Sequence, residues 1–216
     1  MTVARLALLL AIALPLLAGA AAHAQDADDY AAMLEYLAHT RIEDRAFTGA
    51  NGAIAINMAA GDLNHQANLR SVAVGALASA SVGALQRGQA NVATAPTHAS
   101  AVISGNAFQG ASGLVSINQA SGAANAELNA VAVALAQRGI RETPDALLAS
   151  ADFASAGLQA IPEPGAARTQ TRGVGVERSA LQGFDGVLQL NQAAGMGNAT
   201  ENRLLISTHG SLPPGI

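Results

Sequence analysis

The sequence contains no cysteine, no tryptophan and no lysine, and aromatic residues make up only 3% of its 216 positions. Without cysteine the chain has no disulfides, no thiol chemistry and no thiolate metal sites. The net charge is −4, so the basic surface that binding to nucleic acid requires is missing. Because Ala and Gly supply little buried area per residue, a deep globular core is not expected, and repeated backbone pairing is the alternative source of stability.

The first residues have the composition of a secretory signal peptide. Arg5 is followed by an apolar run at residues 6–17 and then by small residues that end in Ala22, His23 and Ala24. The run is too short to span a bilayer comfortably, and no later segment looks transmembrane. We expect cleavage after Ala24, which leaves a mature chain of residues 25–216 that is exported and has no stable membrane insertion.

One pattern occurs three times in the mature chain. The copies are FTGANGAIAINMAAGDLNHQANLRSVAV (47–74), FQGASGLVSINQASGAANAELNAVAV (108–133) and LQGFDGVLQLNQAAGMGNATENRLLI (181–206). Each has a bulky residue, two glycines, an asparagine, a third glycine and two further asparagines at constant spacing, which chance does not explain. The third glycine, Gly61, Gly122 or Gly195, lies among small residues and is expected to form a turn, because glycine reaches positive φ without steric cost.

Alternation of residue types predicts a strand on each side of this turn. Successive side chains of a strand point to opposite faces, so apolar and amide residues share one face in each copy. These faces are Ile54, Ile56, Met58, then Asn68, Val72, Val74; Val115, Ile117, Gln119, then Asn129, Val131, Val133; and Leu188, Leu190, Gln192, then Asn202, Leu204, Ile206. The mirrored order predicts a β-arch in which these two faces meet, and an all-β fold of β-arch or β-solenoid repeats.

The amide residues have the same spacing in all three copies, and turn formation alone does not explain this. A buried amide without a partner costs about 1–3 kcal/mol, whereas arches stacked at the cross-β spacing let each amide bond to its equivalent above and below. The alternative is that these residues lie in exposed turns, where Asn is common for local reasons. The candidate stacking residues are Asn57, Asn64, Asn68, Asn118, Gln119, Asn125, Asn129, Asn191, Gln192, Asn198 and Asn202; Met58 replaces the amide in the first copy.

The remaining segments carry weaker signals. Residues 25–46 place Tyr30, Met33, Leu34 and Leu37 at helical spacing behind an acidic start, which predicts a short helix. The connectors, residues 75–107 and 134–180, are rich in Ala, Gly, Ser and Gln and could add weak strands. Residues 207–216 form a C-terminal tail.

No pattern of catalytic or metal-binding residues stands out. The histidines at 39, 65, 98 and 209 lack a second ligand at a useful spacing, and no serine lies in a nucleophile elbow. The stretch GVGVE, residues 173–177, lacks the full dinucleotide fingerprint. We therefore expect neither an enzyme nor a bound metal or cofactor.

The three Asn/Gln/Gly repeats, joined by two variable connectors behind a signal peptide, resemble the Fap-type functional amyloid subunits of Gram-negative bacteria, and more distantly the curli repeats. The resemblance implies export through an outer-membrane pore and assembly into extracellular fibres that strengthen biofilm. By this resemblance, the amides named above would be the stacking positions. Met58 and the absence of a C-terminal cysteine pair depart from the family pattern, which leaves a principal and a minor or accessory subunit equally open.

The sequence thus predicts a secreted, non-enzymatic subunit of a cross-β fibre with a structural or adhesive role, located outside the cell or at its surface after passage through the periplasm. Its partners would be further copies or related fibre subunits and the export pore. The alternative is a soluble β-solenoid adhesin, binding module or accessory protein of fibre secretion that does not itself polymerise.

Overall fold

The computed structural model describes residues 38–93, 95–136, 152–155, 158–160 and 170–209. All regular structure in these residues is β-strand, which confirms the all-β expectation for this part of the chain. The helix predicted within residues 25–46 and the signal peptide lie outside the described residues, except that residues 39–42 of that segment form a strand.

Nine strands form three groups of three, which we call rungs. Rung 1 comprises β1 (His39–Ile42), β2 (Asn51–Ala60) and β3 (His65–Gly75). Rung 2 comprises β6 (His98–Ile103), β7 (Ser112–Ala123) and β8 (Ala126–Ala136), and rung 3 comprises β11 (Thr171–Val176), β12 (Asp185–Met196) and β13 (Ala199–His209). The strands β4 (Ala84–Arg87), β5 (Asn91–Ala93), β9 (Asp152–Ser155) and β10 (Leu158–Ala160) belong to the connectors.

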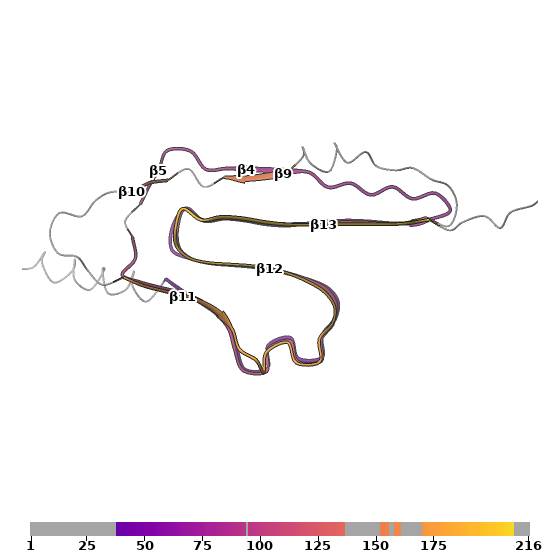
Figure 1. Cartoon of the computed structure of the whole chain (residues 1–216), viewed down its shortest axis with the longest axis horizontal. Helices are drawn as coiled ribbons and strands as arrows, with labels where there is room; N and C mark the ends of the chain where they lie inside the picture. The colour runs from indigo at the N-terminus through magenta and orange to yellow at the C-terminus, as the bar shows by residue number, and fades with distance from the viewer. Residues whose placement is uncertain (1–37, 94, 137–151, 156–157, 161–169, 210–216) are drawn as a thin grey trace, which may run out of the picture. The chain divides into compact units, whose positions relative to one another are not determined.

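Equivalent strands of the rungs pair with one another. The sheets have the orders β1-β6-β11, β12-β7-β2 and β13-β8-β3, and every pair in them is parallel. The register matches each repeat residue with its equivalent, as with Asn57, Asn118 and Asn191. The traces of the three rungs therefore follow one another closely in Figure 1, with rung 2 in the middle of every sheet.

In-register pairing begins upstream of the repeats found in the sequence. The first strand of each rung, β1, β6 or β11, lies before the repeat, and the loop that follows it is also reproduced: Phe47, Phe108 and Leu181 all have positive φ, at 58°, 58° and 64°. The first strands read HTRI, HASAVI and TRGVGV, which share too little for a repeat search to detect. Their pairing is visible only in the structure.

The prediction that the two apolar faces of each arch meet is wrong. The two strands of a copy do belong to different sheets, but β7 turns its Asn118 face toward β8, since Asn129 Nδ2 donates to Asn118 Oδ1 at 2.9 Å. Val115 and Ile117, on the other face of β7, pack against the upstream strands instead. The physical reason is size, because small residues on the Asn118 face let two sheets approach closely, whereas the large aliphatic side chains need the wider space beside the first strands.

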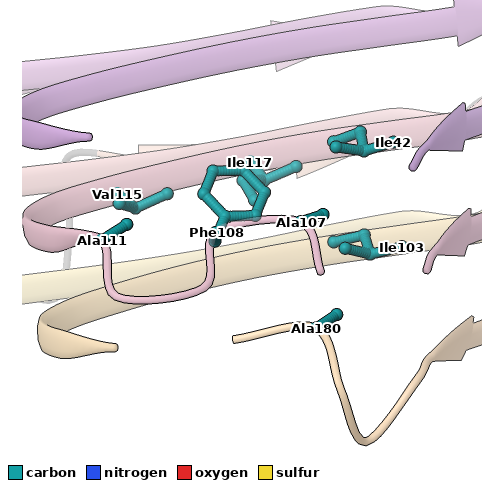
Figure 2. Packing of buried hydrophobic residues seen from close by; sticks show 8 residues of the cluster. All are labelled: Ile42, Ile103, Ala107, Phe108, Ala111, Val115, Ile117 and Ala180. Carbon is teal, nitrogen blue, oxygen red and sulfur yellow. The ribbon is translucent and has the colours of Figure 1, made fainter. Parts of the chain in front are cut away.

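The main hydrophobic cluster occupies that wider space. It contains Ile42 and Ile103 from the first strands, Val115 and Ile117 from β7, and Phe108 from the intervening loop, as Figure 2 shows. Its members repeat from rung to rung, since Ile42 pairs with Ile103 and the partly buried Ile54 pairs with Val115. The hydrophobic core is therefore a set of short apolar columns that run across the rungs.

Phe47 and Phe108 provide a matched test of burial in this column. Their rings are stacked with centroids 5.0 Å apart, and both residues have a φ of 58°, but Phe108 is fully buried whereas 41% of Phe47 is exposed. We expect Phe108→Ala to lower the free energy of unfolding by about 3–5 kcal/mol and Phe47→Ala by clearly less, because a buried ring leaves a cavity. Urea unfolding of the soluble chain, followed by circular dichroism, measures both; equal losses would contradict this account.

Candidate functional site

Two columns of asparagine side chains lie between the second and third strands of the rungs. In the first column, Asn118 Nδ2 donates to Asn57 Oδ1 and Asn191 Nδ2 donates to Asn118 Oδ1, both at 3.0 Å. In the second, Asn129 Nδ2 donates to Asn68 Oδ1 at 2.9 Å and Asn202 Nδ2 to Asn129 Oδ1 at 3.0 Å. Each side chain thus bonds to its equivalent in the neighbouring rung.

The two columns are also joined within each rung. Asn129 Nδ2 bonds to both Asn118 Oδ1 and the carbonyl oxygen of Ile117, at 2.9 and 3.0 Å, and the equivalent bonds recur in rungs 1 and 3. The asparagines therefore tie the two sheets together as well as the rungs. A network whose members are all bonded can be buried without the penalty for unsatisfied polar groups.

A third column lies at the turn. Asn125 donates through both its backbone N and Nδ2 to Asn64 Oδ1, at 3.1 and 2.9 Å, and Asn198 repeats this with Asn125 Oδ1, at 3.1 and 2.8 Å. Asn64 and Asn125 also donate to the carbonyl oxygens of Gly122 and Gly195 in the following rung. The turn is held by its neighbours and not only by local bonds.

The glutamines form a shorter column on the second strands β7 and β12, on the face opposite to Asn118 and Asn191. Gln192 Nε2 donates to Gln119 Oε1 at 2.9 Å, and both side chains reach backbone carbonyls of β6. Met58 occupies this position in rung 1 and has no amide to offer. The glutamine column therefore links the repeat to the first strands, and it stops at rung 2.

Burial in the middle rung excludes the exposed-turn alternative there. Asn118, Gln119, Asn125 and Asn129 are all fully buried, whereas Asn57 at the end of its column is exposed. The structure thus brings together all eleven candidate residues in four columns, and of these eleven only Asn57 is exposed.

The turn glycines are required by the stacking itself. Gly61, Gly122 and Gly195 have φ values of 100°, 117° and 113°, in the region that favours glycine. A Cβ on Gly122 would lie only 1.9 Å from the carbonyl oxygen of Gly195, and a Cβ on Gly61 only 2.2 Å from that of Gly122. Any side chain here would push neighbouring rungs apart.

Sequence reasoning missed several buried polar groups. Ser121 Oγ bonds to Thr40 Oγ1 at 2.8 Å and joins β7 to β1, while Gln189 Nε2 donates to the carbonyl oxygen of Ala130 at 3.2 Å. Glu127, also fully buried, accepts a hydrogen bond from Gln66 at 2.7 Å. Because these positions differ between copies, only the spatial pairing reveals them.

All side-chain bonds between equivalent asparagines point the same way. In each column Nδ2 belongs to the later rung and Oδ1 to the earlier one. Rung 3 therefore ends with the oxygens of Asn198 and Asn202 without a donor from the described residues, and rung 1 ends with Asn57 Nδ2 without an acceptor from them. The two ends of the stack are chemically complementary.

The part of the chain that the structure describes offers no other evident site. It has no group of three acidic or histidine residues positioned to hold a metal ion. Nor do those residues include a helix long and apolar enough to cross a membrane.

Glu127 is expected to make the stability of the fold depend on pH. Burial raises the pKa of Glu127 from 4.5 to about 7, although the hydrogen bond from Gln66 opposes this shift. The unfolded chain releases this proton near pH 4.5 and the folded chain only near pH 7, so stability falls as the pH rises through that window. One pKa unit corresponds to about 1.4 kcal/mol, so the loss could reach about 3 kcal/mol.

Urea unfolding at pH 5 and pH 8 measures this effect in the wild-type chain and in Glu127→Gln. The neutral variant should show a much smaller difference between the two pH values, because its side chain does not titrate. A difference of equal size in both proteins would mean that other groups control the pH dependence.

Comparison with known proteins agrees with this geometry. No solved structure gives a significant match to the chain. The sequence pattern of the functional amyloid protein FapB/FapC family matches residues 19–209 of the 216, which confirms the resemblance to Fap-type subunits inferred from the repeats. Three asparagine-rich copies that bond to one another in parallel register are consistent with the in-register stacking of cross-β structures. The chain belongs to the functional amyloid protein FapB/FapC family.

Proposed function

We propose that the mature chain is a secreted structural subunit whose rungs stack within and between copies, as a β-solenoid, into an extracellular cross-β fibre. The fibre contributes to biofilm matrix or adhesion, and the subunit has no enzymatic role. It reaches the cell surface through the periplasm and an outer-membrane pore, guided by the signal peptide expected at residues 1–24. Its partners are further copies or related subunits of the same fibre.

The observation that carries this proposal is the complementarity of the two ends. If the step from rung to rung is repeated once more, Asn57 of a second copy lies over Asn191, and its free Nδ2 meets the oxygens of Asn191 and Asn202. In the same way Asn64 of the second copy meets Asn198 Oδ1. The contact between copies then uses the same bonds as the contact between rungs.

The edge strands support the same arrangement. Each of the three long sheets ends in a strand of rung 1 on one side and of rung 3 on the other, and within the described residues each of these strands has one neighbour. Unpaired edges are templates for further strands unless they are short, charged or covered. Here β2 and β12 are ten and twelve residues long, and their only acidic or basic residue is Asp185, at the first position of β12.

Two features favour the second candidate, an accessory protein that does not polymerise. A Cβ on Gly195 would lie 2.8 Å from Arg172 Cδ, so this arginine lies where the next turn glycine would stack, whereas Ala99 occupies the equivalent position in rung 2. Met58 also leaves the Gln192 side chain of a neighbouring copy without an amide partner. Growth beyond rung 3 therefore requires the Arg172 side chain to move aside.

Fibre X-ray diffraction on purified residues 25–216, with electron microscopy of the same sample after quiescent incubation, tests the proposal. We expect ordered filaments with reflections near 4.7–4.8 Å and ~10 Å, because parallel in-register stacking has these spacings. A chain that stays monomeric with a β-rich circular dichroism spectrum would contradict self-assembly and favour the accessory candidate. Addition of a related fibre subunit then separates co-assembly from no assembly.

A pair of asparagine variants tests whether the columns continue between copies. Asn118→Ala should destabilise the soluble chain, because each buried group left without a partner costs about 1–3 kcal/mol. Asn57→Ala should destabilise the soluble chain clearly less, because Asn57 is exposed and Asn118 Nδ2 keeps its bonds to Asn68 Oδ1 and to the carbonyl oxygen of Ala67, but it should slow fibre elongation. Urea unfolding and elongation from preformed seeds give the two readouts.

Gln89→Ala is the matched control, since Gln89 is an exposed amide in a connector. It should change neither readout. Elongation by Asn57→Ala at the wild-type rate would mean that the asparagine column ends with each molecule and that copies do not stack through it.

A further inference from the structure

The second half of the third strands carries an exposed apolar face. Val72 and Val74 in β3 are 62% and 70% exposed, and Leu135 in β8 is 37% exposed. Their side chains alternate with Ala73 and Ala134, so they lie on the face that carries Asn68 and Asn129 further back along the same strands. We call Val72, Val74, Val133, Leu135 and Ile206 the valine face.

The exposure of Leu135 shows that these side chains are not exposed merely because they lie at the end of the stack. Leu135 belongs to the middle rung, where the pairing of β8 with β3 and β13 continues along its whole length. The opposite face of the same strand is covered, since Ala132 and Ala134 are 3% and 6% exposed and pack with Ala80. The valine face is therefore open because no element of the described chain lies on it.

The cause is the curvature of the second strands. Near the turn, β7 and β8 are held together by the asparagine columns, but Figure 1 shows the equivalent strand β12 curving away from β13 toward its first residues. The third strands continue straight beyond this point. Their apolar side chains lose the cover that the second strands give to the asparagines.

The residues of the valine face form columns in register. Val72, Val133 and Ile206 pair across the three rungs, and so do Val74, Leu135 and Thr208. None of these side chains is charged; the nearest charged residue on this face is Arg70, which donates a hydrogen bond to the carbonyl oxygen of Ile54 and so points toward β2. The face thus repeats an uncharged, apolar pattern at the spacing of the strands.

The size of the face determines what can bind it. Three rungs with two apolar columns offer only a few exposed side chains, whereas a specific protein interface usually buries at least ~1,000 Å², so one molecule is a poor match for a soluble partner. In a fibre the columns are extended by every added copy, and the area grows in proportion. The surface that matches such a repeating stripe is an identical stripe at the same spacing, as in a steric zipper.

We propose that the valine face is the lateral interface between two fibres of this chain, through which filaments pair side by side. This inference rests on the proposed function, since the stripe exists only if copies stack. Stacking through the asparagines sets the length of a filament, and pairing through the valine face sets how many filaments associate.

The test compares fibres of the wild-type mature chain with those of Val72→Thr/Val74→Thr/Leu135→Thr, by electron microscopy for filaments per fibre and by seeded elongation. Threonine is β-branched, a shape that strands favour and that Val72 and Val74 already have, and it adds a hydroxyl group, so folding and stacking should persist. We expect the variant to elongate at the wild-type rate, to retain both cross-β reflections and to lose its lateral bundles.

The matched control is Leu77→Thr/Leu85→Thr/Val92→Thr, which removes three other exposed apolar side chains, all in the connector between rungs 1 and 2. It should bundle as the wild type does. Bundling of the valine-face variant at the wild-type level, or equal loss in the control, overturns the inference.

Three further outcomes separate this inference from the proposed function. Wild-type fibres with both reflections that remain single filaments overturn the lateral interface and leave the stacking intact. If the triple variant does not assemble, Val74→Thr alone is measured, because 70% of Val74 is exposed. Loss of stacking in that single variant would show that the face belongs to the contact along the fibre and would also overturn the inference, whereas a wild-type chain that forms no cross-β fibre contradicts the proposed function itself.

Discussion

Parallel pairing in register is the constraint on which the rest of the structure depends. It places each paired residue against its equivalent 61 or 73 positions away, so Asn118, buried in rung 2, meets an asparagine on both sides. Asparagine suits this arrangement because it donates and accepts through one group, and a column of asparagines satisfies itself. In the apolar columns, each side chain likewise packs against its equivalents in the neighbouring rungs. A small number of large residues is therefore sufficient to form the hydrophobic core.

The asparagine groups that are bonded on both sides in the middle rung have a partner on one side only in the end rungs. Asn118 and Asn129 are buried and bonded on both sides, whereas Asn57 in rung 1 is exposed. A chain with so few aromatic residues can therefore hold a buried polar network in its middle rung, where each asparagine is bonded on both sides. Within the described residues, the Nδ2 of Asn57 and the oxygens of Asn198 and Asn202 contribute no such bond to the stability of one molecule.

The repeat spacing in the sequence was sufficient to identify the asparagine columns, the turn glycines and the family. The direction of the apolar faces could not be predicted, because period-two alternation assigns Ile117 and Asn118 to opposite faces without saying which one meets the next strand. The first strands could not be predicted either, since His98–Ile103 and Thr171–Val176 share little sequence. Glu127 lies at a repeat position held by Gln66 in one copy and Thr200 in another, so only the pairing reveals its column.

The common direction of the asparagine bonds has an electrostatic consequence. Each side-chain amide carries a dipole, and in these columns the dipoles are aligned along the stack, so they add as peptide dipoles do along a helix. The rung 1 end, with the free Nδ2 of Asn57, is then the partially positive end, and the rung 3 end, with the free oxygens of Asn198 and Asn202, the partially negative one. A filament built from such units has a head and a tail that differ in potential, and ions or charged molecules would distinguish between them.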